Sequence, residues 1–198
     1  MPLGAFKAAL MGASGVSTGD VVLLGTATAS SSATLAFTSG ITSTYGEYVF
    51  RFYDIHPQTD QANLTWQVST DGGSNYGMTI TSSSFVAYHN EDDAGGSHTV
   101  GYHTALHLTQ STAEQRLLYT VGNEADNTGV GELHLFNPAS TTYAKQWMAT
   151  TEESEHQDMN LQSFTGGYIN STDNVDAIRF KFSSGNIDAG KIKMWGVK

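Results

Sequence analysis

The sequence predicts an all-β protein, an antiparallel β-sandwich or jelly roll with an extended arm at its N-terminus. Apolar residues alternate with polar ones over most segments, and clusters of Gly, Ser, Asn and Asp separate these segments. Because successive side chains of a strand point to opposite faces, such alternation indicates strands buried on one face. About ten to twelve short segments of this kind, roughly eight to twelve residues apart, are typical of sandwiches and jelly rolls.

The C-terminal segment 175–198 shows the alternation most clearly. Apolar residues of 177–182 alternate with Arg179 and Lys181, and those of 191–195 alternate with lysines. A Ser-Ser-Gly-Asn turn separates the two runs. We therefore expect two paired strands that close a sheet, and a chain that ends inside its own sheet is expected to need no further segment.

The remaining segments give the other expected elements. Further strands are expected at residues 21–29, 33–37, 47–55, 63–69, 84–90, 115–121, 130–137, 142–150 and 163–169. Segment 70–76 is expected to be a hairpin turn, because Asp-Gly and Gly-Gly readily adopt positive φ. Residues 100–108 are either strand or irregular. Segment 111–121 is the best helix candidate, since Ser111 with Glu114 three positions later resembles a capping box.

Composition favours one globular domain, which we expect over residues 20–198. The chain has 198 residues, of which 39% are hydrophobic and 14% charged, so it can bury one core and is not a disordered chain. It has no cysteine, which excludes disulfides, zinc–thiolate sites and cysteine nucleophiles. No run approaches the roughly twenty apolar residues of a membrane span.

The charge is acidic and unevenly distributed. The formal net charge is −10, yet the segment from Val175 holds five of the nine basic residues and only two of the nineteen acidic ones. An acidic body repels nucleic acid and anionic membranes, so neither is an expected partner. The charge either serves solubility alone, or the basic C-terminal face meets an acidic neighbour such as another copy of the chain.

Residues 1–19 are expected to form an arm separate from the domain. Their only charge, Lys7, lies in the middle of a short apolar run, whereas a secretion signal carries its charge before that run. Two alternatives remain: a loose tail, or an arm that docks on a partner and becomes ordered there. The apolar residues that would make these assembly contacts are Leu3, Phe6, Leu10 and Met11.

No metal site is expected. His98, His103 and His107 lie close in sequence, but His103 and His107 would be roughly 13 Å apart on a strand, and the chain lacks a zinc-hydrolase HExxH pattern. The acidic run 91–93 is expected to be solvated, and calcium there is left open.

No catalytic site or cofactor is expected either. Glycoside hydrolysis needs two carboxylates, one with a raised pKa. Glu152, Glu153, Glu155 and Asp158 supply carboxylates, but in a loop expected to be exposed, where nothing would raise a pKa. Nucleophile-elbow, phosphate-loop and dinucleotide motifs are missing from the sequence. The chain is therefore predicted not to be an enzyme.

Aromatic residues offer a further candidate surface. Trp66 is expected in the core. Four others are candidates for stacking on sugars or for a subunit interface, of which we favour the interface: Phe136, Tyr143, Trp147 and Trp195.

Three passages resemble small virion proteins of tailed bacteriophages, especially marine phages. They are the opening MPLGAFKAALMGA, the block YVFRFYDIHPQTDQANLTWQVSTDGGSNY, and GELHLFNPASTTYAK with the closing AIRFKFSSGNIDAGKIKMWGVK. The resemblance implies a non-enzymatic β-sandwich on the virion exterior, made in the host cytoplasm. The resemblance does not identify any site residues in this chain.

Two roles follow from the resemblance. We favour a capsid decoration (cement) protein, anchored by its arm, because tail-fibre subunits are usually longer and have a shaft. The alternative is a tail fibre or spike component that binds a host receptor or surface glycan, and a polysaccharide hydrolase is a third hypothesis. By analogy we expect a homotrimer that contacts the major capsid protein or a tail protein.

Overall fold

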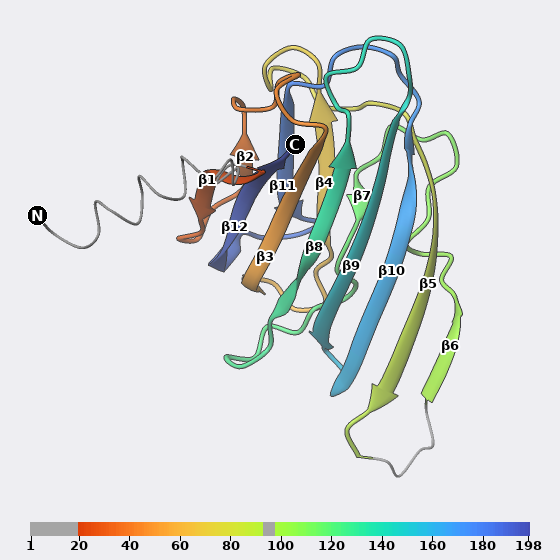
Figure 1. Ribbon diagram of the computed structural model, residues 1–198. Coiled ribbons are helices and arrows are strands. Elements are labelled where there is room, and N and C mark those ends of the chain that lie inside the picture. The colour runs from red at the N-terminus through yellow and green to blue at the C-terminus, as the bar shows by residue number, and fades with distance from the viewer. Residues whose placement is uncertain (1–19, 93–97) are drawn as a thin grey trace, which may run out of the picture.

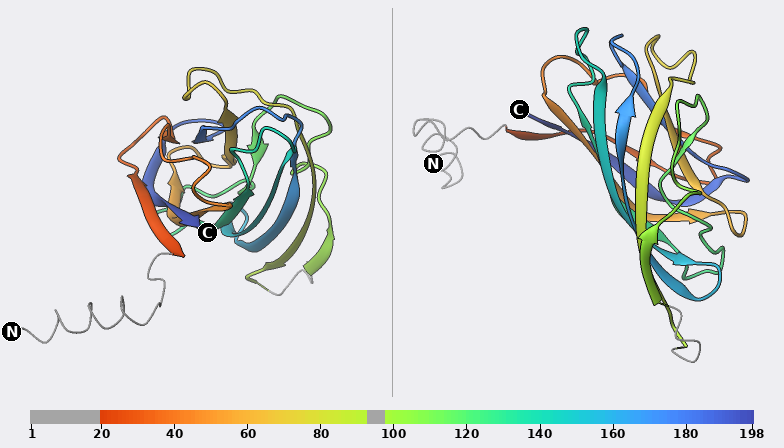
Figure 2. Two further views of the ribbon diagram at one scale, coloured as in Figure 1. Left: turned by 45° about the horizontal axis from the view of Figure 1, so that its top comes forward. Right: turned by 90° about the vertical axis from the view of Figure 1, so that its right-hand side faces the viewer.

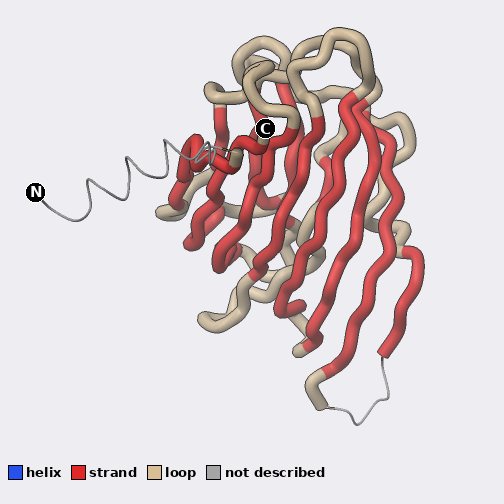
Figure 3. Tube along the Cα trace, in the orientation of Figure 1, coloured by secondary structure: helices blue, strands red, loops and turns tan. Residues whose placement is uncertain are grey.

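The computed structural model describes residues 20–92 and 98–198, and within them the protein is all-β (Figures 1 and 3). The expected arm, with Leu3, Phe6, Leu10 and Met11, lies outside the described residues. The described part of the chain holds no helix that could cross a membrane. Its strands are β1 (Val21–Thr28), β2 (Leu35–Phe37), β3 (Glu47–Pro57), β4 (Leu64–Ser69), β5 (Ile80–Asn90), β6 (His98–Tyr102), β7 (Gln115–Arg116), β8 (Gly129–Phe136), β9 (Lys145–Glu155), β10 (Met159–Ile169), β11 (Ala177–Phe182) and β12 (Ile187–Val197).

The strands form two antiparallel sheets of unequal width. The large sheet has the order β1-β12-β3-β8-β9-β10-β5-β6, and the small sheet has the order β2-β11-β4-β7. The two sheets are stacked in layers, so the prediction of an antiparallel sandwich is confirmed (Figures 1 and 2). The small sheet lies behind one part of the large sheet, and β10, β5 and β6 extend beyond it (Figure 1).

Four strand pairs organise the part of the molecule where the sheets overlap. In the large sheet β1 pairs with β12, and β3 pairs with β8. In the small sheet β2 pairs with β11, and β4 pairs with β7. The first half of the chain thus runs antiparallel to the second half, and both halves cross repeatedly between the layers. The hairpin partners β5–β6 and β9–β10 are added to the same edge of the large sheet.

The core lies between the layers and is rich in aromatic side chains. Trp66 of the small sheet meets Trp147 of the large sheet edge-on, with ring centroids 5.0 Å apart. Phe180 lies against Phe50 and Phe52, at 5.6 and 5.4 Å. All five side chains are almost fully buried. Trp66 is therefore a core residue, as predicted.

The C-terminal strands are not paired with each other, which corrects the prediction. β11 belongs to the small sheet and β12 to the large sheet. The turn 183–186 crosses from one layer to the other and contains Gly185 at φ +67°, where a Cβ would approach the Thr59 hydroxyl oxygen to 2.2 Å. Alternation defines the buried face of each strand, but the two apolar faces point into one core from opposite sides.

Segment 70–76 is a turn but not a hairpin, because it joins β4 of the small sheet to β5 of the large sheet. The Asp71 carboxylate accepts hydrogen bonds from the Ser69 hydroxyl at 2.6 Å and the Asn75 backbone N–H at 2.9 Å. These bonds, led by that from Ser69, lower the pKa of Asp71 to about 2. Asp71 therefore organises the crossing between the layers.

Segment 111–121 forms neither the candidate helix nor the full strand expected at 115–121. Only Gln115 and Arg116 pair as β7, and Val121 forms isolated bridges to Ala62 and Glu155. Leu117 and Leu118 are both buried, although they are adjacent in sequence. Two consecutive buried side chains are incompatible with a one-sided strand, because neighbouring strand residues face opposite ways.

The core makes a direct prediction about stability. Phe180→Ala should lower the free energy of unfolding by about 3–5 kcal/mol, since it removes a buried ring and leaves a cavity. Urea denaturation measures this loss. Phe85→Ala, on the exposed face of the large sheet, is the matched control and should change stability far less. Equal losses for the two variants would contradict the layer assignment.

Candidate functional site

No described segment covers the face of the large sheet that points away from the small sheet, and we call this face the outer face. Of the eight large apolar side chains that are well exposed in the described residues, seven lie on it. They are Val21, Leu23, Phe85, Val100, Tyr102, Val130 and Met148. An apolar face of this kind is unusual for a monomer and marks a contact surface.

The apolar residues of the outer face gather in two patches. The first patch, on β1, β12 and β3, consists of Val21, Val49, Trp195 and Val197, which line a hollow of about 260 Å³. The second patch, on β9, β10, β5 and β6, consists of Met148, Phe164, Phe85 and Tyr102, around a hollow of about 300 Å³. In the second patch the rings of Phe85 and Phe164 stack with centroids 4.8 Å apart.

A charged strip on β3 and β8 separates the two patches. Arg51 pairs with Glu132 at 3.2 Å, and the His134 ring contacts Glu47 through Nδ1 and Glu132 through Nε2. Burial opposes the charged form of His134, but the hydrogen bonds to Glu47 and Glu132 and their charges outweigh it, so the pKa of His134 is raised. Hydrogen bonding to His134 in turn lowers the pKa of Glu132.

The acidic segment near residue 155 is not an exposed loop, which corrects the prediction. β9 continues to Glu155 and β10 begins at Met159, so only a tight turn separates them. Glu153 and Glu155 point to the inner face and are almost fully buried. They share this face because residues two apart in a strand point the same way.

Segment 103–121, apart from β7, covers the inner face beyond the small sheet. It first runs alongside β5, where the His103 backbone N–H donates to the Ser84 carbonyl at 3.0 Å. It then crosses to β9, where the Thr151 hydroxyl donates to the Leu117 carbonyl at 2.9 Å. A small second core, Val86, Leu106 and Leu161, forms beneath it.

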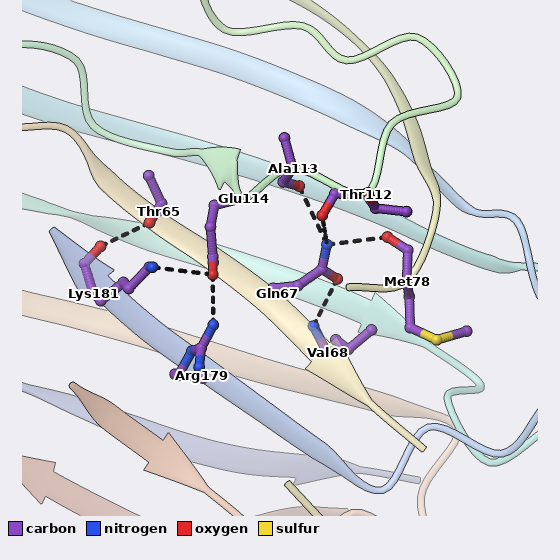
Figure 4. Close-up of polar contacts among 9 residues, drawn as sticks. All are labelled: Thr65, Gln67, Val68, Met78, Thr112, Ala113, Glu114, Arg179 and Lys181. Carbon is purple, nitrogen blue, oxygen red and sulfur yellow. Dashed lines mark hydrogen bonds and ion pairs between the residues drawn. The ribbon is translucent and has the colours of Figure 1, made fainter. Parts of the chain in front are cut away.

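Two polar contacts attach this segment to the small sheet (Figure 4). The buried amide nitrogen of Gln67 donates to the Ala113 carbonyl oxygen of this segment at 3.2 Å, and also to the Met78 carbonyl oxygen, before β5, at 3.0 Å. Glu114 accepts from Arg179 at 2.5 Å and contacts Lys181 at 3.4 Å. Arg179 and Lys181 thus meet an acidic neighbour within the same chain, whereas the sequence left open an acidic partner such as another copy.

The Glu155 carboxylate is held by several groups at the end of β9. It accepts hydrogen bonds from the Thr120 hydroxyl at 2.6 Å and the Gln157 backbone N–H at 2.8 Å, and it contacts His156 Nδ1. Thr120 has φ +48°. This conformation is costly for a β-branched residue and tends to occur at functional sites.

Beside Glu155 lies a cavity of about 300 Å³, which we call the inner cavity. Its lining residues are Tyr88, Asn90, His103, Tyr119, Glu155, Gln157, Met159 and Leu161. The His103 ring meets the Tyr119 ring edge-on at 4.6 Å. Burial, assisted by the charge of Arg116, lowers the pKa of His103, so its ring is neutral at pH 7.

Glu153 lies next to this region and is almost fully buried. One carboxylate oxygen accepts from the Tyr119 backbone N–H at 2.7 Å, while the other has no hydrogen-bond partner in the described part of the chain. Burial raises the pKa of Glu153 well above its ordinary value, and the Tyr119 N–H only partly opposes this. A raised pKa in this segment is what the sequence reasoning missed, because it took the segment to be a loop.

The four candidate aromatics are not brought together. Trp147 is only 3% exposed and packs in the core, which corrects its assignment to the surface, because odd-numbered residues of β9 face inward. Trp195 lies in the first patch and Phe136 on the same face, both partly buried. Tyr143 is 72% exposed, in the loop before β9. Of the four, Trp195 alone belongs to one of the two apolar patches of the outer face.

The three candidate histidines are each in a different aromatic contact. His98 stacks near His89, His103 meets Tyr119, and His107 lies near Tyr102. In the described ranges 20–92 and 98–198, no group of three or more metal-binding side chains occurs. Asp93 of the acidic run lies outside these ranges.

Comparison with known proteins finds no match to a family model, to a curated protein or to a solved structure.

The burial of Glu153 predicts a specific pH dependence. Glu153→Gln keeps an oxygen for the Tyr119 N–H and removes the charge. Because the folded-state pKa of Glu153 is raised above its ordinary value of 4.5, the wild type should lose stability relative to E153Q as pH rises from about 4.5 through that pKa. The slope should approach about 1.4 kcal/mol per pH unit within this window.

Urea denaturation of both proteins at several pH values between 4 and 8 measures this difference. E153Q should be the more stable protein at pH 8, and the advantage should shrink towards pH 4.5. A difference that stays constant with pH would contradict a buried, destabilised carboxylate.

Proposed function

We propose that this chain is a non-enzymatic structural protein of a tailed-bacteriophage virion, and specifically a decoration or cement protein on the capsid exterior. The observation that carries the proposal is the outer face, with its two apolar patches. Burying apolar surface contributes about 25 cal/mol per Å², so both patches together favour a permanent contact in an assembly. The proposal agrees with the resemblance to phage virion proteins, which rests on the sequence.

The topology supports the same proposal. We infer a jelly roll from the four strand pairs β1–β12, β2–β11, β3–β8 and β4–β7, since a jelly roll is one long antiparallel ribbon wrapped into two sheets. Viral capsid and lectin domains commonly use this fold. Because a fold hosts many functions, the topology adds weight only together with the outer face.

We propose that residues 1–19 and the outer face make different contacts in the assembly. The arm would anchor the domain through Leu3, Phe6, Leu10 and Met11, on the major capsid protein or on a tail protein. The outer face would contact neighbouring copies in a homotrimer. The chain would therefore reside on the virion after assembly in the host cytoplasm.

The alternative is a tail fibre or spike component that binds a host-surface glycan. The inner cavity favours this alternative, because aromatic, amide and carboxylate groups line it together. Shell and tail locations are separated by imaging labelled particles.

The outer face can be tested by adding charge to it. The double variant Val100→Glu, Met148→Glu should lower the number of copies per particle at least tenfold, because two carboxylates would lose their hydration at the contact. Quantitative mass spectrometry of purified particles of the phage that encodes the chain measures occupancy. Tyr143→Glu changes an equally exposed aromatic off this face and should leave occupancy unchanged. Full occupancy of the double variant would contradict the proposal.

Deletion of residues 1–15 tests the arm separately. The shortened chain should remain folded and soluble, because residues 20–198 hold a core of their own between the two sheets, but it should no longer join particles. Circular dichroism checks the fold, and copurification with particles checks assembly. Copurification of the shortened chain at full occupancy would rule out an anchoring arm.

A further inference from the structure

We propose that the inner cavity is a binding site for one neutral sugar ring. The cavity lies behind β9 and β10, at the end of the molecule where the added strands extend past the small sheet. This inference deepens the glycan-binding alternative by naming the ligand class of the cavity, and it does not depend on where the protein sits on a particle.

The lining of the inner cavity matches the two kinds of surface that a sugar ring presents. Tyr88, Tyr119 and Leu161 supply apolar surface for the C–H face of a pyranose. Asn90 and Gln157 supply amide groups for its hydroxyls. Apolar surface combined with polar groups that fix the orientation of a ligand is typical of small-molecule sites.

Two polar atoms of the lining residues have unused hydrogen-bonding capacity. Asn90 Oδ1 and His103 Nδ1 are buried and have no hydrogen-bond partner in the described part of the chain. Unsatisfied buried polar atoms are rare and costly in folded proteins. Both atoms belong to side chains that line the cavity, so rotation of these side chains would bring the atoms to a ligand with hydroxyl groups.

Two energetically unfavourable features of the fold, a strained residue and a buried carboxylate, also lie at the cavity. Thr120 adopts φ +48° and donates its hydroxyl to Glu155, and Glu155 is almost fully buried at the cavity wall. Strained backbone and buried charges persist where function retains them. The bonds from Thr120 and Gln157 hold the Glu155 carboxylate in one position, ready to accept a ligand hydroxyl.

Charge around the cavity selects for a neutral ligand. His103 is neutral, so the cavity offers no cation to an acidic sugar. Asn90 and Gln157 also border an adjoining hollow lined by Glu91, Asp92 and Asp158. This acidic rim repels uronic and sialic acids.

The size of the cavity suits a ligand of about one ring, because its volume is about 300 Å³, at the lower end of the range of small-molecule sites. A longer glycan would bind through one residue, with the rest of the chain outside.

Binding is tested with the full-length protein and free glucose, galactose, mannose, N-acetylglucosamine and glucuronic acid. Saturation-transfer NMR and calorimetric titration should detect at least one neutral sugar with a Kd of about 1 mM or lower. Glucuronic acid should bind at least tenfold more weakly. Failure of every neutral sugar to bind at about 50 mM, or preference for glucuronic acid, would overturn the proposal.

Variants locate the site. Asn90→Leu keeps the approximate volume but removes the amide, and it should weaken sugar binding at least tenfold. Gln157→Ala, at an exposed turn position, should also weaken binding and serves if Asn90→Leu does not fold. Trp195→Ala, in the first patch, is the control and should bind sugar like the wild type. Binding lost in Trp195→Ala but retained in Gln157→Ala would place the sugar on the outer face and refute the inner cavity.

The same variants separate this proposal from the assembly role. Gln157→Ala should join particles at full occupancy while losing sugar affinity. The charged outer-face variant should bind sugar normally while failing to assemble.

Discussion

The unequal width of the two sheets is the constraint on which the other features depend. A sheet of four strands cannot cover the whole inner face of a sheet of eight strands. The aromatic core around Trp66 and Phe180 fills the region of overlap, and segment 103–121 covers the region beyond it. The inner cavity lies where this segment, most of which is irregular, meets β9 and β10.

The position of that segment depends on polar anchors. Gln67 binds its backbone, and the Glu114 carboxylate binds two basic side chains of β11. Because Gln67 is buried, loss of its partners would leave an amide unsatisfied, which makes the attachment specific as well as stabilising. The cost of burying Glu153 is tolerated in the same region, next to a site with unused polar atoms rather than in the central core.

The small sheet packs on only one face of the large sheet, and the outer face is the opposite one. No strand of the described chain packs on it, so its apolar residues are exposed within residues 20–92 and 98–198. The charged strip of Arg51, Glu132 and His134 divides the face into two patches that a partner can engage separately. The outer face and the inner cavity lie on opposite sides of the large sheet, so attachment to an assembly and binding of a small ligand would use separate surfaces.

The sequence by itself determined the strand content and which side of most strands is buried, because alternation with period two is a local property: Phe50, Phe52, Ile192 and Met194 are buried as their pattern predicts. Sequence also placed the turn at Asp71. Only the tertiary structure decided which strands are neighbours, since β11 and β12 have equally apolar inner faces whether they pair or face each other across the core. The same holds for Glu153, Glu155 and Trp147. Glu153 and Glu155 are buried because β9 extends under segment 103–121, and Trp147 is buried because it packs on Trp66 of the small sheet. These contacts are distant in sequence and leave no local pattern.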